Sequence, residues 1–385
     1  MSIRSALHLS RVPAACFVIV GLFWGAFAAH VPDLKAQIGA SDAVFGLVIF
    51  GQAAGLLTAM VLAPRLDRRL GRAGLQVAAT ALALAWLLPG WIVTPVGLFL
   101  VMLLLGATSG LLDVSMNARV SELEARHGRT LMNANHAMFS AGYAVAALAS
   151  GLTREAGVPP AWVFGGISLL VFASVPFLAM APEVVEDDPA APAGRYPAWP
   201  LLVCGAIVLV AFMSEATVEQ WSALHIERTL GGGAAEGALG PAMLGLMMTL
   251  GRFSGQAVSD RFDDLWVIRV AACLSASGAV IAALAPGPAV AYLGFGVLGL
   301  GVSVIGPLGL ALAGRSVHPR WRTDVIAKAA VMGFTGFFIA PIFMGGISEI
   351  AGLRVAFAAV AGILALALPL TLLASRLPAP AHRPA

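Results

Sequence analysis

The sequence contains few charged residues. Asp, Glu, Lys and Arg make up 11% of its 385 residues, against about 25% in an average soluble domain. Hydrophobic residues make up 59%, and a soluble fold of this length could not solvate such a surface. We therefore expect a lipid bilayer to be the solvent. The long apolar segments leave no room for a soluble catalytic or nucleic-acid-binding domain.

Cysteine is scarce, and so are the motifs of catalysis. The three cysteines, Cys16, Cys204 and Cys273, fall inside apolar segments without metal-ligand spacing, which predicts packed side chains and no disulfide. The chain contains no Walker loop, zinc-ligand cluster or nucleophile elbow. We expect no enzyme, no metal site and no cofactor, and a membrane-embedded enzyme or sensor is the least favoured class.

Apolar sequence in helix-length runs is abundant. A span needs about 20 apolar residues, and twelve segments fit: 12–31, 43–64, 73–91, 96–118, 132–152, 161–181, 200–222, 241–259, 266–285, 289–313, 326–346 and 355–375. Residues 182–199 are acidic and proline-rich, which is typical of a solvated linker. We predict an all-α membrane protein with a six-helix bundle at 1–181, a cytoplasmic linker at 182–199 and a second six-helix bundle at 200–385.

The basic residues predict the orientation of the chain. With a cytoplasmic N-terminus, all but four of the 23 Lys and Arg residues lie on or next to the cytoplasmic side; the exceptions are Lys35, Arg154, Arg228 and Arg354. The positive-inside rule then places both termini in the cytoplasm. The net charge of +3 follows from this topology and does not indicate an acidic partner.

The two halves repeat each other. Leu66-Asp67-Arg68 follows the second apolar segment, and Ser259-Asp260-Arg261 follows the eighth. The ends of the halves repeat as well, since Gly151, Ala156 and Gly157 recur as Gly346, Ala351 and Gly352. A repeat at half the chain length within apolar sequence indicates two fused membrane units, which is the architecture of a secondary transporter.

This arrangement resembles the major facilitator superfamily over the whole chain. The loop pattern of that family stands at residues 63–72, without its leading glycine and with one inserted residue before Gly71. The second copy, at residues 255–261, lacks the basic tail. The resemblance implies that gating residues stand in both loops: Asp67, Arg68, Arg72, Asp260 and Arg261. Ordinary loop charges are the alternative.

A finer resemblance lies in residues 110–117, 136–140 and 215–221, which look like the fucose permease branch of bacterial inner-membrane carriers. Members of that branch are proton symporters of sugars, and a carboxylate occupies the place of Asp113. The resemblance implies a bacterial cytoplasmic membrane, proton coupling and a sugar-like solute.

Ionisable residues within spans are costly and usually face a cavity or a partner. In the fourth span, Gly106, Gly110, Asp113 and Asn117 share one helical face, on which the glycines permit close packing. Asp113 is our candidate for the proton-coupling carboxylate. The alternative is a headgroup-level carboxylate balanced by Arg119, only about 9 Å further along the helix.

The fifth span places Asn133, His136, Ser140 and Tyr143 on one face. We expect its cytoplasmic half to lie beside that of the fourth span, where His136 would interact with Asp113. A structural histidine is the alternative.

The seventh span carries Glu215 and, one turn later, Glu219. Glu215 is a candidate substrate- or proton-binding group, with an ion pair to an arginine as the alternative. Glu219 and Gln220 are expected to reach water.

Tryptophan positions add one further candidate. Seven tryptophans fall near predicted interfaces, where an aromatic belt explains them: Trp86, Trp91, Trp162, Trp199, Trp221, Trp266 and Trp321. Trp24 lies mid-span in the first helix, and the family resemblance implies that this helix lines the cavity. Trp24 is therefore a candidate for stacking on a substrate, against plain core packing.

Together these features predict a secondary transporter that works by alternating access. The favoured hypothesis is proton-coupled symport of a small polar solute by a monomer in the bilayer, with the proton gradient as energy source. The alternative is an efflux carrier that exchanges drugs or other metabolites for protons.

Overall fold

A computed structural model of the chain describes residues 3–182, 198–259, 261–318 and 321–377, and every regular element in these ranges is helical. The first half contains α1 (Ile3–Leu9), α2 (Arg11–Gln37), α3 (Asp42–Leu70), η1 (Gly71–Ala73), α4 (Gly74–Ala85), η2 (Pro89–Trp91), α5 (Pro95–His127), α6 (Met132–Glu155), α7 (Pro160–Ser174) and η3 (Val175–Leu178). The second contains α8 (Ala198–Leu224), the π-helical turn η4 (His225–Thr229), α9 (Ala234–Ser259), α10 (Asp264–Leu284), α11 (Pro288–Arg315), α12 (Arg322–Ala365) and α13 (Ala367–Ala374).

Local sequence determines where several of these helices begin and end. The Ser41 and Thr94 hydroxyls accept backbone N–H bonds at the starts of α3 and α5, as N-cap residues do. Pro95 occupies the first turn of α5, where its missing N–H costs nothing. The same helix ends at Gly128, whose φ of 62° is the left-handed conformation of a C-terminal cap.

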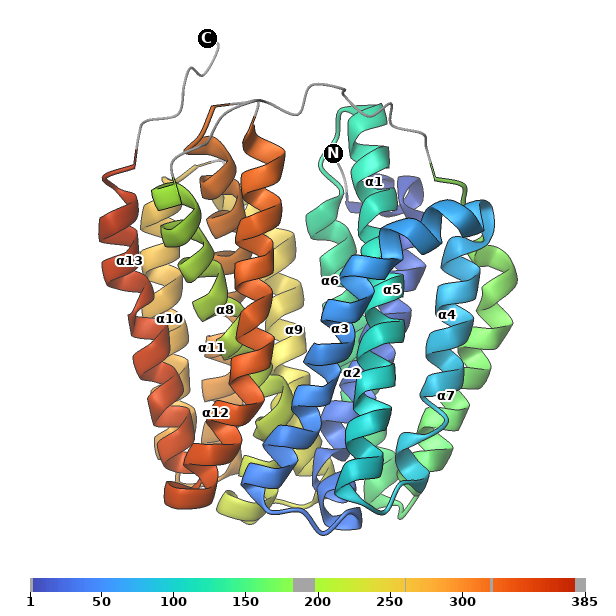
Figure 1. Cartoon of the computed structure of the whole chain (residues 1–385). Coiled ribbons are helices and arrows are strands. Elements are labelled where there is room, and N and C mark those ends of the chain that lie inside the picture. Colours follow the sequence, from blue (N-terminus) through green and yellow to red (C-terminus); the bar gives the residue numbers. More distant parts are fainter. Residues whose placement is uncertain (1–2, 183–197, 260, 319–320, 378–385) are drawn as a thin grey trace.

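The long helices lie side by side in two groups (Figure 1). Helices α1–α7 gather on one side and α8–α13 on the other, with α9 facing the first group. We call the end that carries α1 the inner end, and the end that carries the α2–α3 and η4–α9 connections the outer end. These names follow the topology predicted from the arginines, which stays a prediction.

The two groups meet through α3 against α12 and α6 against α9, with α2 also touching α8 and α9. Glycine allows the first of these pairs to approach closely. A Cβ on Gly46 would lie 2.3 Å from the Pro341 carbonyl oxygen, and one on Gly345 would lie 2.6 Å from that of Asp42. Small residues are typical of membrane helix interfaces. The predicted boundary at 182–199 stays a prediction, because residues 183–197 lie outside the described ranges.

Eight helical segments in the described ranges are long and apolar enough to cross a membrane. Two of them cover more than one helix: Asp42–Trp91 contains α3 and α4, and Asp324–Ala374 contains α13 and most of α12, which is interrupted by a kink at Gly352. Helices α6 and α9 are also long, but they carry more polar residues and do not reach the hydropathy of the others. The predicted count of twelve spans therefore stays a prediction.

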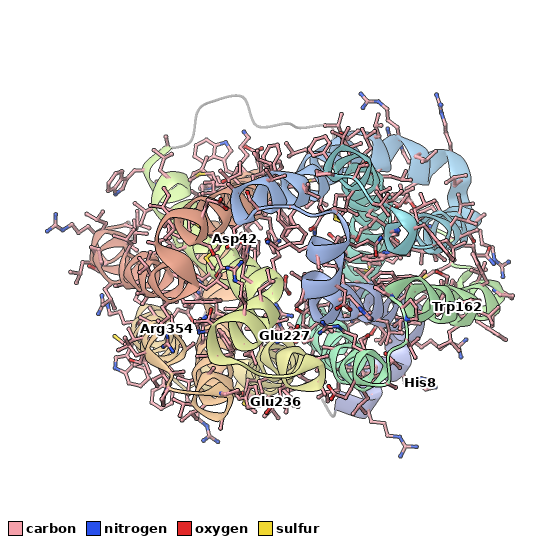
Figure 2. All side chains as sticks on the ribbon, turned by 90° about the horizontal axis from the view of Figure 1, so that it is seen from below. His8, Asp42, Trp162, Glu227, Glu236 and Arg354 are labelled. Carbon is pink, nitrogen blue, oxygen red and sulfur yellow. The ribbon has the colours of Figure 1, made fainter. Side chains whose placement is uncertain are left out.

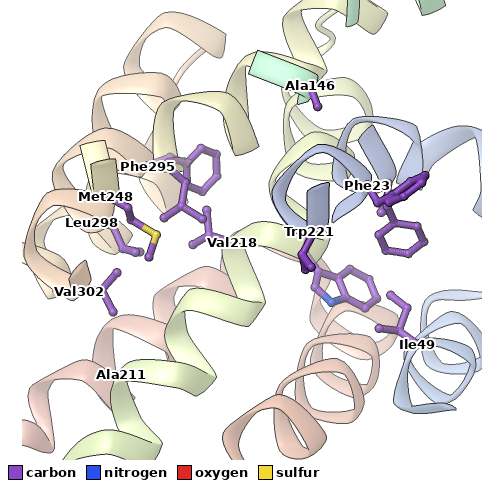
Figure 3. Packing of buried hydrophobic residues seen from close by; sticks show 14 of the residues in the cluster. Phe23, Ile49, Ala146, Ala211, Val218, Trp221, Met248, Phe295, Leu298 and Val302 are labelled. Atoms are coloured by element: carbon purple, nitrogen blue, oxygen red, sulfur yellow. The ribbon is translucent and has the colours of Figure 1, made fainter. Parts of the chain in front are cut away.

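The structure corrects the predicted position of two tryptophans. Trp86 and Trp221 are fully buried, because both rings pack within the helix bundle and not at an interface. Trp86 stacks on Phe23 with ring centroids 5.1 Å apart. Figure 3 shows Trp221 of α8 pointing toward Ile49 of α3, so its indole fills the contact between the two groups.

Candidate functional site

Arg252 of α9 lies where the two groups of helices meet. Its guanidinium donates to Glu215 Oε1 of α8 at 3.1 Å, and it also donates to the Ser140 hydroxyl and to the His136 carbonyl oxygen of α6. The Arg252 and Glu215 side chains are only 10% and 9% exposed. One buried cation therefore bonds to both halves of the chain.

These contacts show which partners Glu215 and Ser140 have. Glu215 forms the ion pair that was its alternative reading, and its partner is Arg252. Ser140 reaches the same arginine, so the two candidates share one cluster. Burying such a pair removes both charges from water, which is costly unless the geometry and hydrogen bonds compensate.

His136 does not lie where the sequence placed it. Helix α6 packs mainly on α2 and α9, and α5 packs mainly on α3, so the expected pairing of the fourth and fifth spans is wrong. The His136 ring contacts Phe17 edge-on at 4.8 Å. In the described part of the chain, no hydrogen bond joins His136 to Asp113. Nearby Asn133 is half-buried in the first turn of α6.

Asp113 lies one turn after Ser109 on the same face of α5. Asn117 donates to Asp113 Oδ1 at 3.1 Å and to its carbonyl oxygen at 2.8 Å. One turn earlier, the Ser109 hydroxyl accepts a bond from Trp24 Nε1 at 3.0 Å. Asp113 is thus about 6 Å along the helix axis from the level of Trp24. The predicted close packing of this helix is confirmed, since a Cβ on Gly106 would lie 1.9 Å from the Gln52 carbonyl oxygen.

A small cavity opens between the halves next to Trp24. Its lining comes from four helices: Trp24, Phe27, Ala28, Gln52, Tyr143, Glu219 and Gln220. Gln220 is only 5% exposed, so the expectation that it reaches water is wrong. It is held inside because α8 packs against α9, α11 and α12 of its own half and against α2 of the other. Trp24, a candidate from sequence, and Glu219 therefore share one cavity.

The loop carboxylate Asp67 pairs within its own half. Both of its carboxylate oxygens accept from Arg119 of α5, each at 3.0 Å, and Arg119 is fully buried. Arg119 is the residue that the alternative interpretation of Asp113 needs as a counter-charge, and here it pairs with Asp67 instead. The other loop candidates, Arg68, Arg72 and Arg261, are exposed. Asp260 lies outside the described residues.

At the outer end, one ion-pair cluster forms around Arg154 of α6. Its guanidinium donates to both Asp33 oxygens at 2.7 Å and to the Glu227 oxygens at 2.6 and 3.2 Å. Because Glu227 belongs to η4, this cluster joins the two halves. Figure 2 views this end and shows Asp42 and Glu227 near its middle.

A second cluster joins α3 to the other half. Arg228 of η4 binds both Asp42 oxygens, and the Ser348 hydroxyl of α12 contacts Asp42 and Arg228. The Glu349 carboxylate accepts the Asp42 N–H at 2.8 Å and the Ala43 N–H at 3.2 Å. A carboxylate at a helix N-terminus is stabilised by the helix dipole. We call these two clusters the outer clusters; both join the two halves at the outer end.

Sequence reasoning missed Arg252 and the outer clusters. Arg252 stands inside an apolar run, which is itself a signal of a functional charge. The predicted topology explains it as one of the basic residues next to the cytoplasmic side, and so hides its role as a charge within the membrane. The outer clusters pair residues far apart in sequence, Asp42 with Arg228 for example, and nothing in the spacing indicates such a pair.

Comparisons with known proteins agree with this geometry. The sequence profile described as Major Facilitator Superfamily matches residues 14–330 and 204–385. An uncharacterized MFS-type transporter of Yersinia pestis is 30% identical over 90% of this chain and 91% of its own length. Membrane protein MosC of Rhizobium meliloti is 27% identical over 88% of this chain and 83% of its own length.

Solved structures resemble the fold. A bacterial homolog of the human lysosomal transporter Spinster, in an inward-facing and occupied conformation, has a TM-score of 0.78 at 16% identity, covering 98% of both chains. The nucleoside transporter NupG has a TM-score of 0.72 at 14% identity, covering 96% of this chain and 99% of its own. At these identities the likeness concerns the fold alone.

Proposed function

The chain belongs to the Major Facilitator Superfamily, and on that premise we propose that it imports a small polar solute together with protons. In this proposal it is a twelve-span monomer of the bacterial cytoplasmic membrane with both termini in the cytoplasm. The two halves rock about the central site and expose it to one side at a time. The proton gradient supplies the energy.

The observation that carries the proposal is the contact of Arg252 with both halves. While Glu215 is ionised, it holds the guanidinium against Ser140 and His136 of the other half. A proton on Glu215 removes the charge that fixes Arg252, so the contact between the halves weakens. Protonation at this point is therefore coupled to movement of one half against the other.

Asp113 has a complementary role in the proposal. It lies about one turn from the level of Trp24, on the face that continues from Ser109. An ionised carboxylate opposes closure of a dry cavity, because an unpaired charge is costly to bury. A proton on Asp113 removes that cost and lets the loaded carrier reorient.

The outer clusters fit an inward-facing state. They tie α3 and α6 of the first half to η4 and α12 of the second, while Asp67 at the inner end is paired within its own half. In the outward-facing state Asp67 would contact the opposite half and the outer clusters would separate. A contact present in one state only biases the equilibrium between the two.

Proton-coupled efflux is the second candidate. One observation favours it: in the described part of the chain, Arg252 pairs with Glu215, while neither Asp113 nor Glu219 forms an ion pair with a cation. A negative cavity suits an exported cation as well as an imported proton. The two candidates predict opposite proton movements when the solute enters from the same side.

The test uses purified protein in liposomes with a pH-sensitive dye inside and no imposed gradient. Sugars, polyols, sugar acids and a nucleoside are added outside, along with a lipophilic cation to represent drugs. Acidification of the lumen by one solute indicates symport and identifies its class. Alkalinisation indicates exchange and favours efflux. No response to any solute by folded protein would contradict proton-coupled transport of these classes.

A further inference from the structure

The small cavity beside Trp24 has the chemistry of a cation site. Trp24 and Phe27 stand edge to face with ring centroids 5.5 Å apart, and the Tyr143 ring lines the cavity from α6. Hydrogen bonding to Ser109 fixes the Trp24 indole in place. Aromatic faces carry negative charge density and attract ammonium groups, with tryptophan the strongest of them.

A carboxylate lines the cavity together with these aromatic rings. Glu219 lines the same cavity, and in the described ranges no Lys, Arg or His side chain forms an ion pair with it. Arg252 lies in the neighbouring cluster, where it pairs with Glu215. A half-buried carboxylate without a cation calls for a positive ligand or a proton.

Gln220 gives an independent sign of a missing ligand. This residue is only 5% exposed, and its Oε1 has no hydrogen-bond partner in the described structure. A buried acceptor without a donor costs free energy unless a ligand or water supplies one. Because Gln220 lines the cavity, its partner belongs there.

The size of the cavity restricts what enters it. The room between the side chains is about that of a water molecule, which suits an ammonium group but not a sugar ring. An ammonium group has three donors and no acceptor, so it can serve Glu219 and Gln220 together. The rest of such a solute would extend toward Gln52, which lines the cavity from α3 and whose amide can bond to hydroxyl groups.

We propose that the transported solute is a hydroxylated primary amine, of the amino sugar or amino polyol class. Its ammonium group sits between Glu219, Gln220 and the ring of Trp24. This inference rests on the proposed transport function and names the substrate class of the same site. A neutral sugar would leave Glu219 without a partner, and an anion would meet a cavity that already carries excess negative charge.

The experiment compares three solutes that share one pyranose ring and differ at position 2: glucosamine, glucose and N-acetylglucosamine. Binding to the purified protein is measured by calorimetry, and proton movement is measured in liposomes with the internal dye. We expect glucosamine to bind at least about tenfold more tightly than the two neutral solutes, as a charge pair plus a cation–π contact allow. Galactosamine and an amino polyol extend the amine set.

Variants assign that preference to the cavity. Glu219→Gln should bring the amine within about threefold of its neutral analogues, while Glu236→Gln, at an exposed glutamate in the first turn of α9, should leave the preference intact. Equal losses for amine and neutral solutes in Glu219→Gln would overturn the amine site and make Glu219 a proton carrier.

Two further outcomes separate this inference from the proposed function. Proton-coupled movement of the neutral sugars with no response to any amine would overturn the amine class and leave the transport proposal standing. No proton movement with any solute would overturn the transport proposal, and failure of glucosamine to bind the folded protein would then overturn the amine site as well.

Discussion

Single charges at the contact between the halves have the largest expected effects. Arg252 is nearly buried, and its partners come from α6 and α8. Apolar residues would pack there with less desolvation cost, so a buried ion pair at this place is not explained by stability. In the proposed mechanism its value is that one proton on Glu215 can break it.

Replacing Arg252 by Gln should lower both thermal stability and transport. The substitution leaves Glu215 buried without its cation, and removing one partner of a buried pair costs about 3–5 kcal/mol. Thermal unfolding in detergent measures the loss, with the exposed Arg376→Gln as control. The double variant Arg252→Gln, Glu215→Gln should regain most of the stability but not the transport. An unchanged unfolding midpoint in the single variant would contradict this account of the pair.

Asp113→Asn should separate exchange from accumulation. The amide copies the shape of a protonated carboxyl, so the loaded carrier still reorients, but it cannot release a proton. We expect solute exchange between the two sides to persist and gradient-driven accumulation to fall to the background of empty liposomes. Asp324→Asn, at an exposed residue near the start of α12, is the control. Accumulation driven by pH in Asp113→Asn would remove Asp113 from the coupling role.

At the scale of helices, the outer clusters act through the ends of α3 and α12. Asp42 binds Arg228 through its side chain while its N–H and that of Ala43 donate to Glu349. Both contacts break together if α3 moves away from the second half. The opening of the outer end therefore requires the loss of several charge-assisted bonds at once.

Asp42→Asn should make the outer end open more often. Phe45 is fully buried and packs on Trp221 of the other half, with ring centroids 6.0 Å apart. A cysteine at position 45, in a chain without its three native cysteines, should react with a bulky maleimide only when the halves separate. We expect labelling several times faster with Asp42→Asn than with Asp42 retained. Equal rates would mean that this cluster does not hold the outer end closed.

Gly352 marks the turn between the last two predicted spans. Its φ of 81° and ψ of 167° lie in a region that is essentially restricted to glycine. Gly352→Ala should therefore destabilise the protein by about 1–3 kcal/mol. Gly362→Ala is the matched control, since a Cβ there meets nothing within 4 Å. A thermal midpoint as high in Gly352→Ala as in the control would disprove the strain.

The positions of the helices along the chain can be predicted from the sequence better than which helices pack against each other. Apolar length indicates where a helix runs, and the glycine face of α5 was recognised from spacing alone. Rotation and pairing depend on contacts between distant segments, which one sequence does not encode locally. This is why Trp86 was placed at an interface and His136 beside Asp113. The Asp67–Arg119 pair is not predicted from the sequence for the same reason, although both residues are named there as candidates.

At the scale of the whole molecule, the charges are distributed unevenly between the two ends. The outer end holds its ions in pairs across the halves, around Arg154 and Arg228. At the inner end, Arg68, Arg72 and Arg261 are exposed. Exposed arginines at one end of a membrane protein favour the cytoplasmic side and its anionic lipids. Among the ion pairs found in the described residues, the pairs Arg154–Glu227 and Arg228–Asp42 cross the two halves at the outer end.

This reasoning predicts a definite topology, which fusion proteins can test. A fluorescent protein that folds only in the cytoplasm should be bright when joined after residue 190 or after residue 385. Alkaline phosphatase, which is active only outside, should be active when joined after Gly39 or Gly232, in the two outer connections. Because these sites alternate in the predicted order, a span count that is wrong by one helix between two neighbouring sites would invert the signal at every later site. Phosphatase activity at residue 190 would reject the six-plus-six arrangement, and the assignment of the outer clusters to the outside would fail with it.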